Sequence, residues 1–253
     1  MSDVDRYALR FLGVGNAAAV ELGSASVVLE RDDQPLLLVD CGQEALTAYF
    51  DRYEAVPPAL FVTHTHLDHV AGFERLFVRA WFDRPRSMPK LLVPASVVPL
   101  LHQRVGSYPN ALAEGGVNFW DAFQVIPVGD HFWLDGLRFE TFEVRHHAPR
   151  SAYGLRLPGS FVFTGDTRPI PEVLAGFDEP LIAHDCALIG NPSHSGIDDL
   201  EREYPRALLD RLLLYHYASA ADGAALAARG YRIARTGEAY PLSPPSPIAD
   251  DVT

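Results

Sequence analysis

A dense group of histidine and aspartate side chains follows a short apolar segment near residue 60. Residues 59–62 (ALFV) are predicted to form a buried strand, and they lead into THTHLDH at residues 63–69. His64 and His66 lie two residues apart, so on an extended chain their side chains leave the same face. Buried polar side chains need partners, and ordinary hydrogen bonds within a core do not explain such a density of them. The segment therefore predicts a metal site at the end of a strand.

Apolar segments on both sides of this motif show the spacing of strands and of helices. Strands are predicted over residues 7–12, 26–30, 36–40, 59–62, 137–144, 153–157, 160–164, 181–183 and 212–215, and helices over 43–53, 198–209 and 220–229. Strands followed by helices, twice over, are typical of a layered α/β domain with sheets inside and helices outside. We assign residues 1–240 to one such domain. The proline-rich segment 241–253 cannot hold a ladder or a helix and is predicted to be an extended, mobile end.

The charge of the chain argues against a partner that is itself a polyanion. Of 253 residues, 33 are acidic and 21 basic, which gives a formal net charge of −12, and Lys90 is the one lysine. Proteins that bind long nucleic acids neutralise phosphates with lysine and arginine, so a small-molecule substrate is expected instead. No apolar run is long enough to span a membrane, and residues 1–6 lack the features of a signal peptide, so a cytoplasmic protein is expected. A monomer and a homodimer are both open.

The motif HxHxDH at residues 64–69 resembles the signature of metallo-β-lactamase-fold hydrolases, and the resemblance covers most of the chain. It implies an αββα sandwich in which two central sheets are flanked by helices, with the site at one edge. The predicted strands and helices agree with that architecture. The resemblance also implies that His64 and His66 bind one metal ion, while Asp68 and His69 bind a second.

The same resemblance implies a third histidine for the first metal ion, at a strand end far along the chain. The predicted strand 137–144 leads into His146 and His147. Phe142, Val144 and His146 share one face of an extended strand, so His146 is the predicted ligand. His147 is the alternative, because a bulge would reverse the register.

Two more residues complete the implied ligand set. Asp166 follows the apolar strand 160–164 and matches a carboxylate that bridges both metal ions, with a turn-capping aspartate as the alternative. His216 follows the predicted strand 212–215 and matches the last ligand of the second ion, with a hydrogen-bonded lone histidine as the alternative. Five histidines and two aspartates without a thiolate suit two divalent ions, first Zn²⁺, and also tolerate Mn²⁺ or Fe. Two such ions about 3.5–4 Å apart would share a hydroxide that attacks the substrate.

Other segments are similar to the ribonuclease Z and phosphodiesterase branch of this fold. They are residues 11–15 (FLGVG), 24–30 (SASVVLE), 39–42 (VDCG), 184–187 (HDCA) and 194–200 (HSGIDDL). The resemblance implies that Asp40 stands beside the site and helps to hold a histidine. It also implies that His194 protonates the leaving group, with an exposed loop histidine as the alternative. Asp68 and His194 are therefore the candidate catalytic residues.

The chain departs from ribonuclease Z in the part that would meet a tRNA. It has no glycine- and proline-rich basic arm, and residues 108–120 form an aromatic, acidic insertion in which Phe119 and Trp120 are candidates to touch a substrate. Together with the negative net charge, these features favour a small phosphodiester or a cyclic nucleotide over tRNA. A lactonase, thioesterase or sulfatase activity and a metal-bound ligand sensor with little turnover are the alternatives, since this fold hosts many reactions.

Overall fold

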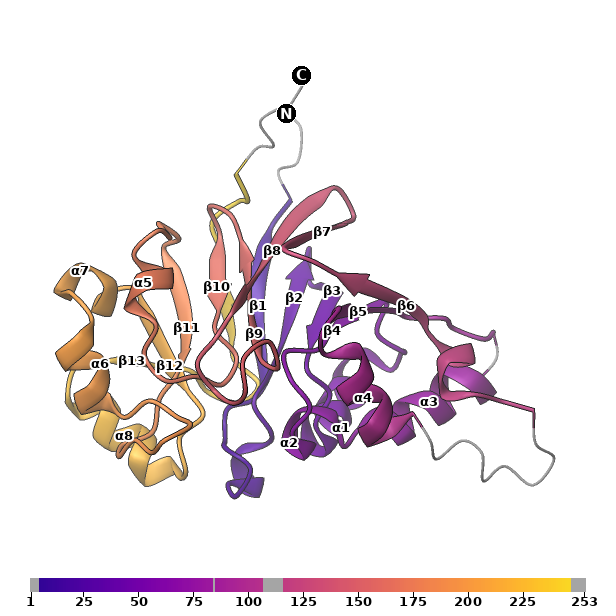
Figure 1. Cartoon of the computed structure of the whole chain (residues 1–253), viewed down its shortest axis with the longest axis horizontal. Coiled ribbons are helices and arrows are strands. Elements are labelled where there is room, and N and C mark those ends of the chain that lie inside the picture. Colours follow the sequence, from indigo (N-terminus) through magenta and orange to yellow (C-terminus); the bar gives the residue numbers. More distant parts are fainter. Residues whose placement is uncertain (1–4, 84, 107–115, 247–253) are drawn as a thin grey trace.

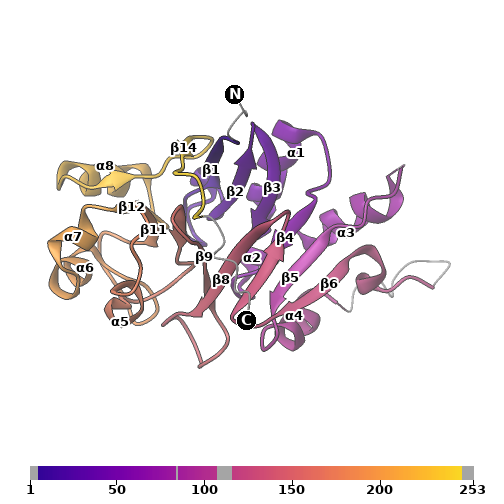
Figure 2. The same cartoon turned by 90° about the horizontal axis from the view of Figure 1, so that it is seen from above.

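Two sheets pack face to face in the centre of the protein, and helices cover the outer face of each (Figure 1). The computed structural model describes residues 5–83, 85–106 and 116–246. Seen from above, the helices of the first part of the chain and those of the last part lie on opposite flanks of the sheets (Figure 2). This arrangement confirms the predicted sandwich of two sheets between helices.

The first sheet comes from the N-terminal half of the chain and one late strand. In spatial order its strands are β14 (Ala239–Pro241), β1 (Tyr7–Gly13), β2 (Ser26–Arg31), β3 (Gln34–Val39), β4 (Ala59–Phe61), β5 (Lys90–Pro94) and β6 (Gln124–Val128). The helices on its outer side are α1 (Gln43–Tyr53), α2 (Leu67–Val70), α3 (Phe73–Phe82) and α4 (Val98–Val105). Helix α1 forms as predicted, because its buried residues recur on one face at helical spacing.

The second sheet comes from the C-terminal half. Its strands are β13 (Arg232–Ile233), β12 (Leu212–Tyr215), β11 (Leu181–Asp185), β10 (Phe161–Phe163), β9 (Tyr153–Leu157), β8 (Leu137–Glu143) and β7 (His131–Leu134). The helices beside it are α5 (Pro171–Leu174), α6 (Ile197–Glu203), α7 (Arg206–Leu209) and α8 (Ala220–Ala228). Residues 198–209, predicted as one helix, form α6 and α7 instead, because Pro205 lacks a backbone N–H and favours extended backbone before it.

Parallel strands bring the carboxyl ends of both sheets to one edge of the sandwich. Strand β3 pairs in parallel with β4, and β10, β11 and β12 pair in parallel with one another. Loops that follow such strands gather at the same edge, where α/β proteins place their ligands. The predicted metal ligands follow β4, β8, β10 and β12, so the topology itself brings them together.

The C-terminal segment differs from the expectation up to residue 246. Pro241 pairs with Ala8 in an antiparallel ladder, and the backbone N–H of Leu242 donates to the carbonyl of Tyr7 (3.0 Å). A proline is compatible with an edge strand such as β14, because its missing N–H can face away from the ladder. The expected mobile end does not begin at residue 241, and residues 247–253 lie outside the described residues.

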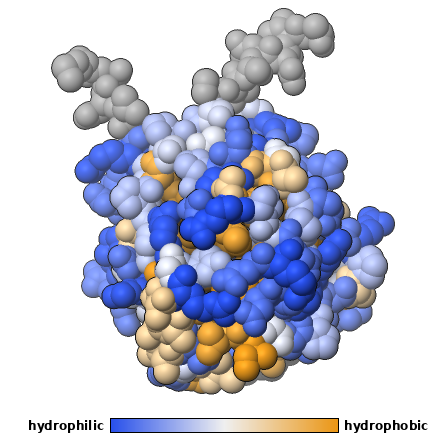
Figure 3. Space-filling model, turned by 90° about the vertical axis from the view of Figure 1, so that its left-hand side faces the viewer, coloured by the Kyte–Doolittle hydropathy of each residue, from blue (hydrophilic) through white to orange (hydrophobic). Residues whose placement is uncertain are grey.

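The face beside α6 to α8 is mostly hydrophilic, and hydrophobic residues gather toward its lower end (Figure 3). Exposed large apolar side chains of the protein include Val20 and Leu67, which are 64% and 61% exposed. None of the helices in the described part of the chain combines the length and apolar character needed to cross a membrane.

Gly42, the residue before α1, packs tightly against the backbone of Asp68. A Cβ atom at Gly42 would lie 2.1 Å from the carbonyl oxygen of Asp68 and 2.5 Å from Cβ of Ser24. Gly42→Ala is therefore expected to lower the free energy of unfolding by about 1–3 kcal/mol through overpacking. Urea unfolding monitored by circular dichroism measures this loss. Gly129→Ala is the matched control, because a Cβ there meets open space, and equal stability of the two variants would contradict the packing argument.

Candidate metal centre

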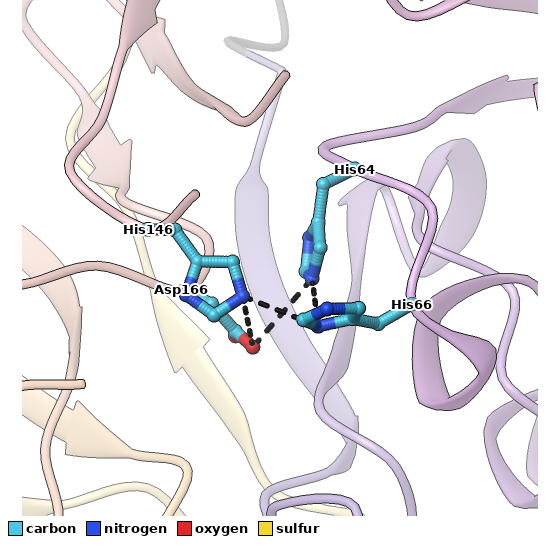
Figure 4. Close-up of side chains that lie close together, drawn as sticks. All are labelled: His64, His66, His146 and Asp166. Atoms are coloured by element: carbon cyan, nitrogen blue, oxygen red, sulfur yellow. Dashed lines mark hydrogen bonds and ion pairs between the residues drawn. The ribbon is translucent and has the colours of Figure 1, made fainter. Parts of the chain in front are cut away.

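Three imidazoles and one carboxylate converge between the two sheets (Figure 4). His64 and His66 follow β4 in the first sheet, whereas His146 follows β8 and Asp166 follows β10 in the second. Nδ1 of His66 lies 3.1 Å from Nε2 of His64 and 3.2 Å from Nε2 of His146. Oδ2 of Asp166 lies 3.7 and 3.8 Å from the Nε2 atoms of His64 and His146. These four ligand atoms lie within 4.8 Å of one another, close enough to share one metal ion.

A second group of possible ligands shares Asp166 with the first. It adds Asp68 and His69, in helix α2, and His216, which follows β12. Oδ2 of Asp166 lies 3.2 Å from Nε2 of His69 and 3.2 Å from Nε2 of His216. Oδ2 of Asp68 lies 3.5 and 3.9 Å from the same two nitrogens. Because one carboxylate belongs to both groups, the residues form two adjoining sites. All seven residues predicted as ligands lie in these two groups.

Asp40 orients two of the imidazoles, His69 directly and His64 through the hydroxyl of Thr63. It is fully buried, and its backbone has a φ of 63°, a left-handed conformation that residues other than glycine keep only where surrounding contacts determine it. Its carboxylate accepts hydrogen bonds from Nδ1 of His69 (2.7 Å) and from the hydroxyl of Thr63 (2.7 Å). That hydroxyl in turn accepts from Nδ1 of His64 (3.0 Å). In both imidazoles the lone pair of Nε2 is therefore left to face the other ligands, as metal binding requires.

His146, and not His147, belongs to the first group. The carbonyl oxygen of Ser193 accepts a hydrogen bond from Nδ1 of His146 (3.0 Å), so the lone pair of Nε2 faces His66. His147 is exposed, and its ring lies edge-on to that of His66 with centroids 4.4 Å apart. His146 is thus the histidine that the sequence favours, but the expected extended strand does not carry it: β8 ends three residues earlier, at Glu143, and residues 145–148 form a bend.

The buried atoms at this site fit divalent cations. Among the residues that the structure describes, Nε2 of His69, Nε2 of His216 and Oδ1 of Asp166 are buried and have no hydrogen-bond partner. Native proteins rarely leave such atoms unpaired, and each one needs an explanation such as a bound ion. Imidazole and carboxylate donors without a thiolate suit Zn²⁺ and related metals. The residues present therefore match the cofactor that the sequence predicts.

The ionisation of the site also suits cation binding. Burial raises the pKa of Asp166, but His216 and His69 lower that pKa to well below its ordinary value, so the carboxylate is charged. Burial and the neighbouring imidazoles lower the pKa of His66 to about 4, which leaves this ring neutral near pH 7. Burial lowers the pKa of His216, but Asp166 and a second carboxylate raise it well above its ordinary value. A cation bound there would take the place of that proton.

Asp185, at the end of β11, is a site residue that the sequence interpretation missed. Its Oδ2 accepts hydrogen bonds from Nδ1 of His194 (2.8 Å) and from the backbone N–H of Thr167 (2.8 Å). Its Oδ1 lies 3.3 Å from Nδ1 of His216, whose φ of 71° is again left-handed. The rings of His194 and His216 stack with centroids 4.6 Å apart. The available signal was the segment 184–187 (HDCA), in which Asp185 comes two residues after the apolar run 181–183.

A cleft of about 790 Å³ opens onto both groups, and Asp68, Asp166 and His194 line it. The expectation that Phe119 and Trp120 touch the substrate is wrong for this cleft, which neither of them lines. Phe119 is fully buried against α3, with its ring 5.8 Å from that of Phe73, because the first sheet needs apolar cover there. Residues 107–115 of the same insertion lie outside the described residues.

Metal content tests the two groups separately. Protein purified without chelator is expected to hold close to two transition-metal ions per chain. Asp68→Ala should hold close to one, because Asp68 belongs to the second group only. Elemental analysis makes the measurement, and His131→Ala, which removes an exposed histidine of β7, is the control. Protein that holds no metal and takes up none on reconstitution would contradict the assignment of both groups.

The same measurement separates His146 from His147. His146→Ala should empty the first site, because Nε2 of His146 faces the other ligands. His147→Ala should keep both ions at saturating metal and weaken binding by no more than about 10–100-fold, as changes beside a ligand do. A His147→Ala protein that loses one ion while His146→Ala keeps two would show that the register is off by one residue.

Solved structures of similar shape show which fold this is. The metallo-β-lactamase fold protein YhfI from Bacillus subtilis superposes with a TM-score of 0.75 at 16% identity, covering 93% of this chain and 99% of that chain. A diphosphatase of the PhnP family superposes with a TM-score of 0.72 at 18% identity, covering 93% and 97%. The short form of human tRNase Z superposes with a TM-score of 0.64 at 17% identity, covering 92% of this chain and 98% of that chain. The sandwich is therefore the metallo-β-lactamase fold.

Curated relatives show the family. The Anti-Pycsar protein Apyc1 of Saccharibacillus brassicae is 32% identical over 220 residues, which cover 83% of this chain and 89% of the relative. The Anti-Pycsar protein Apyc1 of Bacillus phage BSP38 is 26% identical over 267 residues, which cover 92% of this chain and 98% of the relative. The family model described as Anti-Pycsar protein Apyc1 matches residues 7–240. The chain belongs to this family and is a metal-dependent hydrolase of the metallo-β-lactamase fold.

Proposed function

We propose that this enzyme hydrolyses a small phosphodiester and that a cyclic nucleotide is its preferred substrate. The observation that carries the proposal is the position of His194. It lines the same cleft as the two ligand groups and belongs to neither, but forms a further cluster with Asp185 and His216. Breaking a phosphodiester requires a nucleophile on one side of phosphorus and a proton for the leaving oxygen on the other. A thiolate or phenolate leaving group has less need of that proton. A separate imidazole therefore favours a substrate with an alkoxide leaving group.

The two ligand groups would hold two divalent cations. Zn²⁺ is the expected metal, with Mn²⁺ or Fe as alternatives, and PqqB of Methylobacterium extorquens, which has a similar fold, was solved with Zn²⁺ bound. When bound, two such ions would activate water as the nucleophile and would polarise the phosphoryl oxygen. Asp68 is the ligand carboxylate nearer the substrate, because its side chain is 11% exposed whereas that of Asp166 is 1% exposed.

His194 holds the proton for the leaving oxygen. Its Nδ1–H donates to Asp185, so Nε2 is left for the substrate side, and the side chain stays 19% exposed at the cleft. A buried carboxylate at Nδ1 fixes the orientation of the ring. Stacking on His216 fixes the ring plane relative to the second ligand group. His194 therefore donates a proton at Nε2 as the bond to the leaving oxygen breaks.

The size and charge of the cleft favour a small substrate over a nucleic acid. Its volume of about 790 Å³ is in the range of small-molecule sites, roughly 300–1,000 Å³. Arg104 is the one lysine or arginine among the described residues that line it. A long polyanion would need several such cations along its backbone. We place this activity in the cytoplasm, as the sequence predicts.

Substrate class is tested by direct comparison. Metal-loaded protein is expected to hydrolyse a 3′,5′-cyclic nucleotide and bis(p-nitrophenyl) phosphate, and to leave a lactone and a thioester largely intact. Asp166→Ala should lose nearly all phosphodiesterase activity, because it removes a carboxylate from both ligand groups. Product formation followed by chromatography and absorbance gives the rates. Faster turnover of the lactone or the thioester than of any phosphodiester would contradict the proposal.

Leaving-group dependence tests His194. His194→Ala is expected to lose about 10²–10⁴-fold in kcat on a cyclic nucleotide, whose leaving group is a ribose alkoxide. It should lose far less on bis(p-nitrophenyl) phosphate, because nitrophenolate leaves without a proton. Metal content should stay unchanged, and His131→Ala is again the control. Equal losses on both substrates would assign His194 to substrate positioning, and no loss on either would leave it an ordinary loop histidine.

A further inference from the structure

A carboxylate that binds no metal faces the cleft proposed for an anionic substrate. Glu44, the second residue of α1, is half-buried and lines that cleft. A negative charge there repels a phosphodiester at close range. Glu44 must therefore face a different part of the ligand. That part must be neutral and carry a hydrogen-bond donor, because a carboxylate only accepts.

Ser24 fixes one oxygen of Glu44 and leaves the other available. The hydroxyl of Ser24, which is 5% exposed, donates to Oε2 of Glu44 at 2.5 Å. No hydrogen bond to Oε1 is found among residues 5–83, 85–106 and 116–246. The carboxylate is thus held in one orientation with an acceptor to spare, which is how binding sites position polar groups that recognise a ligand.

The segment 40–44 places Glu44 beside the second ligand group. Asp40 holds His69, and Gly42 packs against Asp68, since a Cβ at Gly42 would lie 2.1 Å from the carbonyl oxygen of Asp68. The same Cβ would lie 2.6 Å from Oγ of Ser24. One short stretch of chain therefore supports the ligands on its buried side and presents Glu44 to the cleft.

We propose that Glu44, held by Ser24, is a specificity-determining residue that accepts a hydrogen bond from the nucleoside half of the substrate. This inference rests on the proposed hydrolysis of cyclic nucleotides. The nucleoside half of 3′,5′-cyclic AMP carries two neutral donors of the required kind, the ribose 2′-hydroxyl and the exocyclic amine of the base. A site built to bond such a donor rejects an analogue without it, because the acceptor is then left unpaired.

Glu44→Gln is the sharpest test. Its amide oxygen keeps the bond from Ser24, while its NH₂ replaces the free acceptor with a donor. We expect kcat/KM for 3′,5′-cyclic AMP to fall about 10–100-fold, the range for a lost hydrogen bond to a charged group. Activity on bis(p-nitrophenyl) phosphate, which has no nucleoside, should stay unchanged or rise slightly as repulsion is removed. Asp51→Asn is the matched control, because it makes the same charge change at an exposed position of the same helix, away from the cleft.

Two analogues identify the donor. If the 2′-hydroxyl is the donor, wild type disfavours 2′-deoxy-3′,5′-cyclic AMP and Glu44→Gln loses nothing further on it. If the amine is the donor, the same pattern appears with the cyclic phosphate of purine riboside. Either pattern supports the proposal. The proposal would be overturned if Glu44→Gln lost kcat/KM equally on cyclic AMP, both analogues and bis(p-nitrophenyl) phosphate. It would also be overturned if the selectivity of Glu44→Gln among these substrates matched that of wild type.

A purely structural role for Glu44 gives a different result. An acidic residue in the first turn also stabilises a helix, so that role would lower Tm without changing the ratio of rates between substrates. Metal content and Tm are therefore measured for each variant. Wild-type protein that cleaves bis(p-nitrophenyl) phosphate but no cyclic nucleotide would refute the proposed substrate itself. A Glu44→Gln protein with wild-type selectivity among cyclic nucleotides would refute the role of Glu44 alone.

Discussion

The buried carboxylate of Asp166 is the group on which the arrangement of this protein depends. Its side chain is 1% exposed, and its Oδ2 lies within 3.8 Å of Nε2 atoms on four imidazoles. A charge buried in an apolar sandwich is stable only when its neighbours compensate it. Of these rings, His64 and His69 follow β4 in the half of the chain that forms the first sheet, and His146 and His216 follow β8 and β12 of the second. His69 and His216 are the two that lower the pKa of Asp166 and so compensate its charge. The site therefore joins the two halves of the sandwich at the edge where their strands end.

Local patterns were sufficient to predict most of this framework. Strands 153–157 and 212–215 form with the predicted bounds, because each is a short apolar run between polar turns. The motif at residues 64–69 places four histidine and aspartate side chains in one segment, and the resemblance to metallo-β-lactamase-fold hydrolases makes them candidate ligands. For His146, the resemblance implied a third histidine at a strand end, and the alternation of faces favoured His146 over His147. For the strands and for the choice of His146 over His147, the information lies within a few residues of the position predicted.

Where the interpretation was incomplete, the missing information is long-range. Asp185 contacts His216 because β11 pairs in parallel with β12, a register that places Asp185 opposite Tyr215. No local pattern specifies that pairing. Phe119 has the composition of a pocket wall but is buried in the core below α3. Pro241 pairs only because β1 has a free edge for β14. The residue type, such as an aromatic or a proline, limits the environments that a position can occupy. Long-range packing and strand pairing decide which of these environments the residue occupies.

The acidic character of the chain and an anionic substrate are compatible because the positive charge of the cleft would come from bound cations. Arg104 is the one lysine or arginine among the lining residues described, so the protein itself contributes little permanent positive charge to attract a phosphate. Bound ions recognise any phosphoryl oxygen alike and cannot distinguish one phosphodiester from another. Selectivity must then come from groups that contact the neutral part of the ligand. In this cleft, the proposed role of Glu44 is to distinguish substrates by their nucleoside. Its negative charge does not interfere with phosphate binding, because the metal ions would bind the phosphate and Glu44 would accept a hydrogen bond from the nucleoside.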